Sequence, residues 1–135
     1  MSPVEVGTTL PSISTVFTRT TLVRYAGAST DFNPIHYSDA KAAELGLPGV
    51  IAHGMLTMGA ALRVVTDWCG DPSRVLSYFV RFTKPVPVPD TDEGVTLTFG
   101  GTVTKVADGV ATVSVDARLG DVKVLGAATA EVRFD

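Results

Sequence analysis

Cysteine and long hydrophobic runs are scarce in this sequence, and each scarcity excludes a class of protein. One cysteine among 135 residues cannot form an internal disulfide, so nothing indicates an oxidising compartment. Cys69 ends an apolar stretch, and we expect it to be a buried small side chain and not a nucleophile. The longest apolar-rich stretch, residues 55–65, is too short to cross a bilayer and contains Arg63.

Basic residues are also few. Lys and Arg total 11 against 14 Asp and Glu, which gives a formal net charge of −3 and a pI near 5.2. A nucleic-acid-binding surface needs a clustered basic excess, so we expect no nucleic-acid partner. The first residues contain neither the basic nor the apolar segment of a signal peptide. We therefore expect a soluble, cytoplasmic protein without a membrane span.

What the sequence does contain is the composition of one globular domain. Hydrophobic residues make up 45% and charged residues 19%, and no repeat or long linker divides the chain. We expect a single domain over residues 1–135. The first half is predicted to be helical over three stretches: 19–28, which Thr18 can cap; 39–45, between Ser38 and Gly46; and 54–69, which Gly70 ends.

The second half changes to a period of two. Apolar and polar residues alternate in four runs, 76–82, 95–103, 111–119 and 129–135. Turns rich in Gly, Asp and Pro separate the runs, which is typical of an antiparallel sheet with one covered face. The helix predicted over 54–69 has apolar residues on nearly every side, which indicates that other structure surrounds it. The pattern predicts an α+β fold whose sheet curls around this helix.

The segment "TDFNPIHYSD" places Asp31, Asn33, Pro34 and His36 within six residues. Pro34 fixes its own φ and disfavours a helical conformation at Asn33, so the loop should be stiff. A stiff loop can hold Asp31 and His36 at a separation that one water molecule bridges, and such a pair suits proton transfer near neutral pH. An alternative stays open, in which Asp31 and Asn33 are ordinary turn residues and His36 is a structural histidine.

The segment "PGVIAHGMLTMG" could form a second part of the same candidate site. Gly54 stands where the long helix should begin, and a free backbone N–H there can hold an oxygen that gains negative charge. Its alternative role is a simple helix start. His53 is expected mainly to shape this turn. A metal site of Asp31, His36 and His53 matches none of the usual ligand spacings, so no metal is expected. The two segments together suit proton chemistry next to a carbonyl.

Residues 25–59, "YAGASTDFNPIHYSDAKAAELGLPGVIAHGMLTMG", resemble the hydratase signature of the MaoC-like (R)-specific enoyl-thioester hydratases and dehydratases. Residues 64–89 are similar to the catalytic (B) subunit of the mycobacterial (3R)-hydroxyacyl-ACP dehydratases, a branch of that family. The resemblance implies the hot-dog fold, a curved antiparallel sheet wrapped around one long central helix.

The resemblance also implies roles for individual residues. The family's catalytic pair falls on Asp31 and His36, its asparagine on Asn33, and its carbonyl-binding N–H on Gly54. Tyr25 and His53 are candidates for a supporting role. The implied reaction interconverts a (3R)-3-hydroxyacyl thioester and a trans-2-enoyl thioester, and it needs no metal or other cofactor.

The implied substrate is an acyl-ACP thioester of fatty-acid elongation of the mycolic-acid type. One alternative is an (R)-specific enoyl-CoA hydratase of fatty-acid breakdown or polyester supply, and another is a non-catalytic acyl-binding hot-dog subunit. Retention of both Asp31 and His36 counts against the non-catalytic alternative, and the N-P-I-H loop counts against a thioesterase. Because a single hot-dog unit leaves a sheet edge uncovered, we expect a dimer with an identical chain or with a non-catalytic hot-dog sister subunit.

Overall fold

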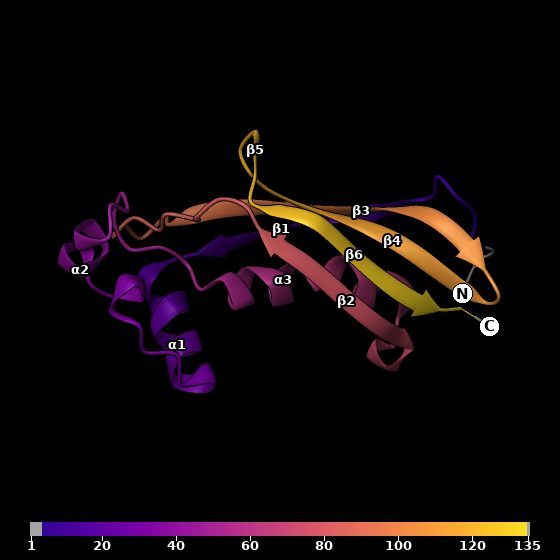
Figure 1. Ribbon diagram of the computed structural model, residues 1–135, viewed down its shortest axis with the longest axis horizontal. Helices are drawn as coiled ribbons and strands as arrows, with labels where there is room; N and C mark the ends of the chain where they lie inside the picture. The colour runs from indigo at the N-terminus through magenta and orange to yellow at the C-terminus, as the bar shows by residue number, and fades with distance from the viewer. Residues whose placement is uncertain (1–3, 135) are drawn as a thin grey trace.

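One antiparallel sheet lies against one long helix in the computed structural model, which describes residues 4–134 (Figure 1). Residues 1–3 and 135, which belong to the expected domain and to the last predicted strand, lie outside the described residues. Figure 1 shows α3 along one face of the sheet, with α1 and α2 at the end away from both termini. The elements in chain order are β1 (Thr9–Phe17), α1 (Arg19–Ser29), η1 (Pro34–His36), α2 (Asp39–Glu44), α3 (Gly54–Cys69), η2 (Pro72–Arg74), β2 (Val75–Phe82), β3 (Val95–Ala107), β4 (Val110–Leu119), β5 (Val122–Lys123) and β6 (Leu125–Arg133).

The sheet has the strand order β1-β3-β4-β6-β2, and the short β5 pairs with β4. Its inner face consists of the apolar residues that alternate in the sequence. Phe99 of β3 faces Ala117 of β4, and Val103 faces Val113, and all four side chains are buried. Burial of each Phe or Val side chain contributes roughly 1.5–3 kcal/mol, so these pairs hold the sheet against the helix. The predicted sheet and the α+β class are confirmed.

β1 is a strand that the sequence analysis did not predict. Leu10 and Phe17 at its two ends are buried, and the strand pairs with β3 along the sheet edge. The pairing register shifts between Leu10 and Ile13, next to Pro11. Such a bulge moves the alternation of apolar residues by one position, and Pro is tolerated in edge strands. The period of two is therefore broken inside β1, which hides the strand.

The three predicted helices are present, and local residues explain their ends. The Thr18 side chain accepts a hydrogen bond from the N–H of Thr21, and the Thr21 side chain accepts one from the N–H of Thr18. At α2, the Ser38 side chain accepts a hydrogen bond from the N–H of Lys41. Gly70, with a φ of 75°, ends α3 in the left-handed conformation that glycine adopts without strain.

α3 is most deeply buried on one side, where Ala61, Val64 and Val65 lie. The expectation that other structure surrounds this helix on nearly every side holds within one chain except along one stripe, because the sheet curves around the rest of the helix. The exposed stripe recurs every fourth residue, at Met55, Gly59, Arg63 and Asp67. None of the helices within residues 4–134 combines the length and the apolarity that a membrane crossing needs.

Candidate active site

The loop after α1 is fixed by side chains that each bind a backbone N–H two residues further on. Ser29 Oγ accepts from the N–H of Asp31 at 3.2 Å, and Asp31 Oδ1 accepts from the N–H of Asn33 at 3.2 Å. Asn33 Oδ1 in turn accepts from the N–H of Ile35 at 3.2 Å. Such bonds offer the backbone an alternative to a helix or a strand ladder. Asn33 thus holds the loop, and its backbone contacts Asp31.

This arrangement occupies Oδ1 of Asp31 and leaves Oδ2 able to bind another group. Oδ2 of Asp31 lies 3.9 Å from Nε2 of His36, and the Asp31 side chain is 50% exposed. A separation of 3.9 Å is too long for a direct hydrogen bond, but a water molecule can bind both atoms. The predicted proximity of the two groups is therefore present in the structure.

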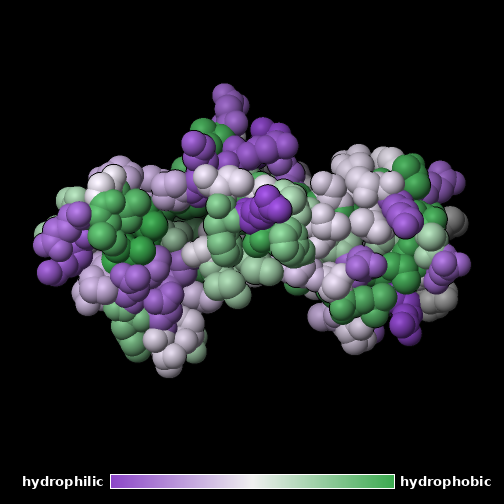
Figure 2. Space-filling model, in the orientation of Figure 1, coloured by the Kyte–Doolittle hydropathy of each residue, from purple (hydrophilic) through white to green (hydrophobic). Residues whose placement is uncertain are grey.

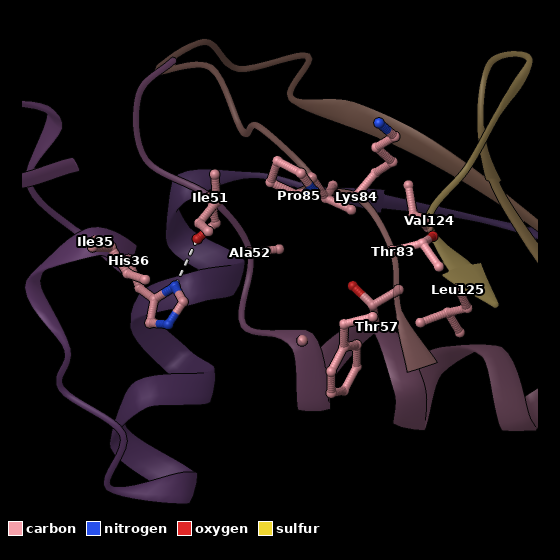
Figure 3. A pocket seen from close by; sticks show the side chains of 13 residues that line it. Ile35, His36, Ile51, Ala52, Thr57, Thr83, Lys84, Pro85, Val124 and Leu125 are labelled. Atoms are coloured by element: carbon pink, nitrogen blue, oxygen red, sulfur yellow. Dashed lines mark hydrogen bonds between the residues drawn. The ribbon is translucent and has the colours of Figure 1, made fainter. Parts of the chain in front are cut away.

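The orientation of His36 follows from its contact with Ile51. Nδ1 of His36 lies 2.7 Å from the Ile51 carbonyl oxygen, the bond drawn dashed in Figure 3. A carbonyl can only accept, so Nδ1 carries the proton and Nε2 presents its lone pair toward Asp31. The N–H of Ile51 also donates to the carbonyl of Ile35 at 3.1 Å, which fastens the loop to this segment. His36 is thereby held in the tautomer that a general base requires.

His53 packs against the loop that carries Asp31 and His36. Its ring stacks on His36 with centroids 3.8 Å apart, and Tyr25 contacts it edge-on at 4.8 Å. Nε2 of His53 donates to the Asp31 carbonyl oxygen at 3.2 Å. The residue is 1% exposed, and this burial lowers the pKa of the His53 imidazole and keeps the ring neutral. These contacts agree with a structural role for His53.

The same groups bear on the alternative of a metal site. Ligand atoms of Asp31, His36 and His53 all lie within 4.8 Å of one another. Each histidine, however, uses one nitrogen on a backbone carbonyl, and the rings are stacked 22° from parallel. The remaining nitrogens therefore lie in two nearly parallel ring planes, which is an unfavourable arrangement for two histidine ligands of one ion. The geometry favours a proton-transfer pair.

Gly54 begins α3 beside this pair. Helical hydrogen bonding leaves its N–H without a partner inside the helix, at the positive end of the helix dipole. A Cβ at this position would lie 3.0 Å from Cε1 of Phe82. Glycine therefore lets the Phe82 ring pack on the first turn of α3.

A cavity of about 360 Å³ opens at this point (Figure 3). Two of the predicted site residues, His36 and Gly54, border it, and much of the rest of its wall is apolar, including Val86, Val124 and Leu125. Apolar walls with a few polar groups at one end suit a ligand that has an apolar chain and a polar head.

Asp39 holds the segment before His53 in place, and the sequence analysis did not predict this role. From the sequence, Ser38 and Asp39 indicated only the start of a helix. Oδ1 of Asp39 accepts from the N–H of Val50 at 2.9 Å and from Nη2 of Arg19 at 3.0 Å. The bond from Val50, and then the one from Arg19, hold the pKa of the Asp39 carboxyl below its usual value. The side chain thus fixes the segment that leads to His53.

Comparison with known proteins identifies the family of this chain. Residues 3–121 match the family model described as MaoC like domain. The chain is 35% identical to the 3-oxo-4,17-pregnadiene-20-carboxyl-CoA hydratase beta subunit of Mycobacterium tuberculosis. The alignment spans 118 residues, and it covers 86% of this chain and 88% of that protein. It is also 46% identical to the 3-hydroxyacyl-thioester dehydratase X of the same organism. That alignment spans 68 residues, and it covers 50% of this chain and 23% of that protein.

A solved structure agrees with the sequence matches. The structure named MaoC-like dehydratase superposes with a TM-score of 0.93 at 42% identity, over 98% of this chain and 41% of that chain. The curved sheet around α3 is thus the hot-dog fold that the resemblance implied. A family match over most of the sequence and a nearly complete superposition lead to one conclusion: the chain belongs to the MaoC-like domain family.

Proposed function

We propose that this protein is a hydro-lyase that adds water reversibly to a trans-2-enoyl thioester and forms a (3R)-3-hydroxyacyl thioester. The observation that carries the proposal is the 3.9 Å separation of Asp31 Oδ2 and His36 Nε2, next to the cavity where α3 begins at Gly54. A water molecule held by both groups would lie beside a substrate whose carbonyl oxygen binds the Gly54 N–H.

In the hydration direction, Nε2 of His36 takes one proton from the water, while the hydrogen that stays on the oxygen donates a hydrogen bond to Asp31 Oδ2. The water oxygen forms a bond to C3, and the electrons of the C2=C3 double bond move toward the thioester carbonyl. The enolate oxygen is stabilised by the N–H of Gly54. C2 then takes the proton from His36, which returns to its neutral form. The Asp31 carboxylate stabilises the imidazolium in the interval.

Dehydration reverses these steps. His36 removes the proton from C2 and then gives it to the hydroxyl on C3, which leaves as water. Because one loop carries both Asp31 and His36, the hydroxyl and the C2 proton are handled on the same face of the substrate. The addition is therefore syn, and the resemblance to the family implies the (3R) product.

The leading carrier is an acyl carrier protein, as in fatty-acid elongation of the mycolic-acid type. The resemblance of residues 64–89 to the (3R)-hydroxyacyl-ACP dehydratases supports this choice, and the similarity to 3-hydroxyacyl-thioester dehydratase X supports the substrate class. Coenzyme A is the alternative, and it is favoured by the hydratase beta subunit, which aligns along 86% of this chain. Lys84 borders the cavity and is exposed, and either carrier brings a phosphate that such a cation can bind.

The protein acts as a dimer, with an identical chain or with a sister subunit. β2 is an edge strand, and its residues Leu76, Phe79 and Phe82 are 47%, 55% and 54% exposed. Figure 2 shows apolar surface in the centre of this face, where Figure 1 places the end of β2. An apolar edge strand invites pairing, and Phe82 also borders the cavity, so a partner along β2 would cover the site. A monodisperse, active monomer in light scattering would contradict this assembly.

The function is tested with crotonyl-CoA and crotonyl-ACP, by following the loss of the enoyl absorbance. The purified protein should hydrate at least one of them, and the higher kcat/KM identifies the carrier. Asp31→Asn at an equal folded fraction is the control, because it keeps an oxygen for the Asn33 N–H but lacks the carboxylate. No hydration of either thioester, or equal hydration by the variant, would refute the proposal.

A further inference from the structure

Thr57 lies one turn beyond Gly54 on α3 and carries a hydroxyl that the fold leaves unpaired. The residue is 2% exposed, and its Oγ1 has no hydrogen-bond partner within residues 4–134. Buried hydroxyls are normally hydrogen-bonded, because an unpaired one costs stability. A helical threonine often bonds to the carbonyl four residues back, which here is His53. That carbonyl instead accepts the N–H groups of Leu56 and Thr57.

The hydroxyl of Thr57 faces the cavity. Thr57 and Gly54 both border the cavity, and residues three positions apart lie on the same face of a helix. Helical side chains point toward the N-terminus, so the Thr57 side chain covers the first turn, where the Gly54 N–H is free. Figure 3 shows the Thr57 oxygen directed into the open space that His36 borders from the other side.

The surroundings indicate what this hydroxyl can bind. Val124 and Leu125 lie nearby in the cavity wall, and neither side chain offers a polar atom. The hydroxyl of Thr83, also in the wall, already donates to the Lys123 carbonyl at 3.2 Å. An acyl chain in this cavity would offer Thr57 no acceptor, whereas the thioester carbonyl oxygen next to Gly54 would.

We infer that Thr57 is a second donor to the thioester oxygen, which receives the Gly54 N–H on one lone pair and the Thr57 O–H on the other. This inference rests on the proposed function, since it names the substrate atom that Thr57 binds. Two donors that stand ready before the charge develops stabilise an enolate oxygen more than the ground-state carbonyl. The stability that the unpaired hydroxyl costs is thus offset when substrate arrives.

The test compares Thr57→Val, Thr57→Ser and wild type on crotonyl-CoA or crotonyl-ACP, whichever the wild type hydrates faster. Thr57→Val keeps the shape and removes the hydroxyl, so kcat should fall on the order of 10²-fold with little change in KM. Thr57→Ser should recover most of the rate. The urea midpoint of Thr57→Val should equal or exceed that of wild type. Thr66→Val is the matched control, because Thr66 lies on the same helix and its hydroxyl contacts the Arg63 carbonyl.

Each other outcome has a definite meaning. Wild-type kcat in Thr57→Val, or a rise in KM alone, overturns the role of Thr57 and leaves the proposed function intact. A lower urea midpoint also overturns it, because the hydroxyl would then be paired in the folded protein, for example through a water shared with the buried Nδ1 of His53. A wild type that hydrates neither thioester refutes the proposed function, and this inference with it.

Discussion

The sheet and the loop of residues 29–53 keep their shapes by different means. In the sheet, backbone ladders join neighbouring strands, and alternating apolar side chains such as Phe99 bury one face. In the loop, polar side chains bond to the backbone, as Asn33 does with Ile35 and Asp39 does with Val50. The sheet therefore should contribute mainly to stability, whereas the loop positions Asp31 and His36. Substitutions should separate the two contributions.

The largest effect is expected at the proposed catalytic pair, Asp31 and His36. Asp31→Asn and His36→Asn should each lower hydration by about 10²–10⁴-fold, the range for one positioned acid or base. Both variants keep a group for the local backbone contact, Oδ1 for the Asn33 N–H and an amide N–H for the Ile51 carbonyl. Their free energies of unfolding in urea should therefore stay near the wild-type value. A wild-type rate in either variant would show that the loop does not carry the chemistry.

A substitution in the sheet should lower stability and leave turnover nearly unchanged. Phe99 is 0% exposed, so Phe99→Ala should lower the free energy of unfolding by about 3–5 kcal/mol through lost burial and a new cavity. The molecules that stay folded should keep a kcat near wild type, because Phe99 lies outside the cavity lining. The measurement is urea denaturation together with turnover corrected for the folded fraction. A large fall in corrected turnover would mean that the two regions are coupled.

Asp39 tests how firmly the loop must be held. Asp39→Ala removes the acceptor for Val50 and Arg19, so the segment before His53 should shift and turnover should fall by about 10- to 100-fold. Asp39→Asn keeps an oxygen for Val50 and should lie between Asp39→Ala and wild type. Equal activity in all three proteins would show that Asp39 does not position the site.

Asp39 also has a pH signature. Since its folded pKa is lowered, its stabilisation is present above the unfolded value of about 3.9 and is lost as the pH falls through the folded pKa. The urea midpoint of wild type should thus approach that of Asp39→Asn in strong acid. Midpoints that keep their separation there would contradict the ion pair with Arg19.

The smallest effect concerns His53. Burial lowers the pKa of its imidazole, so below about pH 6.5 the unfolded chain takes up a proton that the folded chain does not. Stability should therefore decline as the pH falls from about 7 to about 5. His53→Gln should flatten this decline, while an amide N–H can still reach the Asp31 carbonyl. Identical pH profiles would show that His53 is not held neutral by the fold.

Much of the fold could be predicted because its signals are local. Thr18, Ser38 and Gly70 mark helix ends through contacts within a few residues, and the alternation in β3, β4 and β6 repeats along each strand. β1 was missed because the bulge after Leu10 changes the side of the strand that carries the apolar residues. The exposed stripe on α3 was missed because apolar composition does not say how many layers cover a helix.

The candidate site could be predicted where side chains that are close in sequence form it. Asp31 and His36 are close in sequence, and Pro34 stiffens the turn between them. The tautomer of His36 depends on the carbonyl of Ile51, and a backbone carbonyl has no signal in the sequence. Thr57 resembles any other small residue in an apolar helix until the cavity beside it is known.

Hydration of the crotonyl thioester in deuterated water tests most directly whether Asp31 and His36 act together from one loop. In the proposed mechanism the two groups bind one water and the Gly54 N–H holds the carbonyl, so hydroxyl and deuterium should add to the same face. Chiral chromatography and proton coupling of the 3-hydroxybutyryl product then give both stereocentres. The expected product is the (3R)-alcohol formed by syn addition. Predominant (3S) product, or anti placement of deuterium, would contradict the proposed geometry of the site.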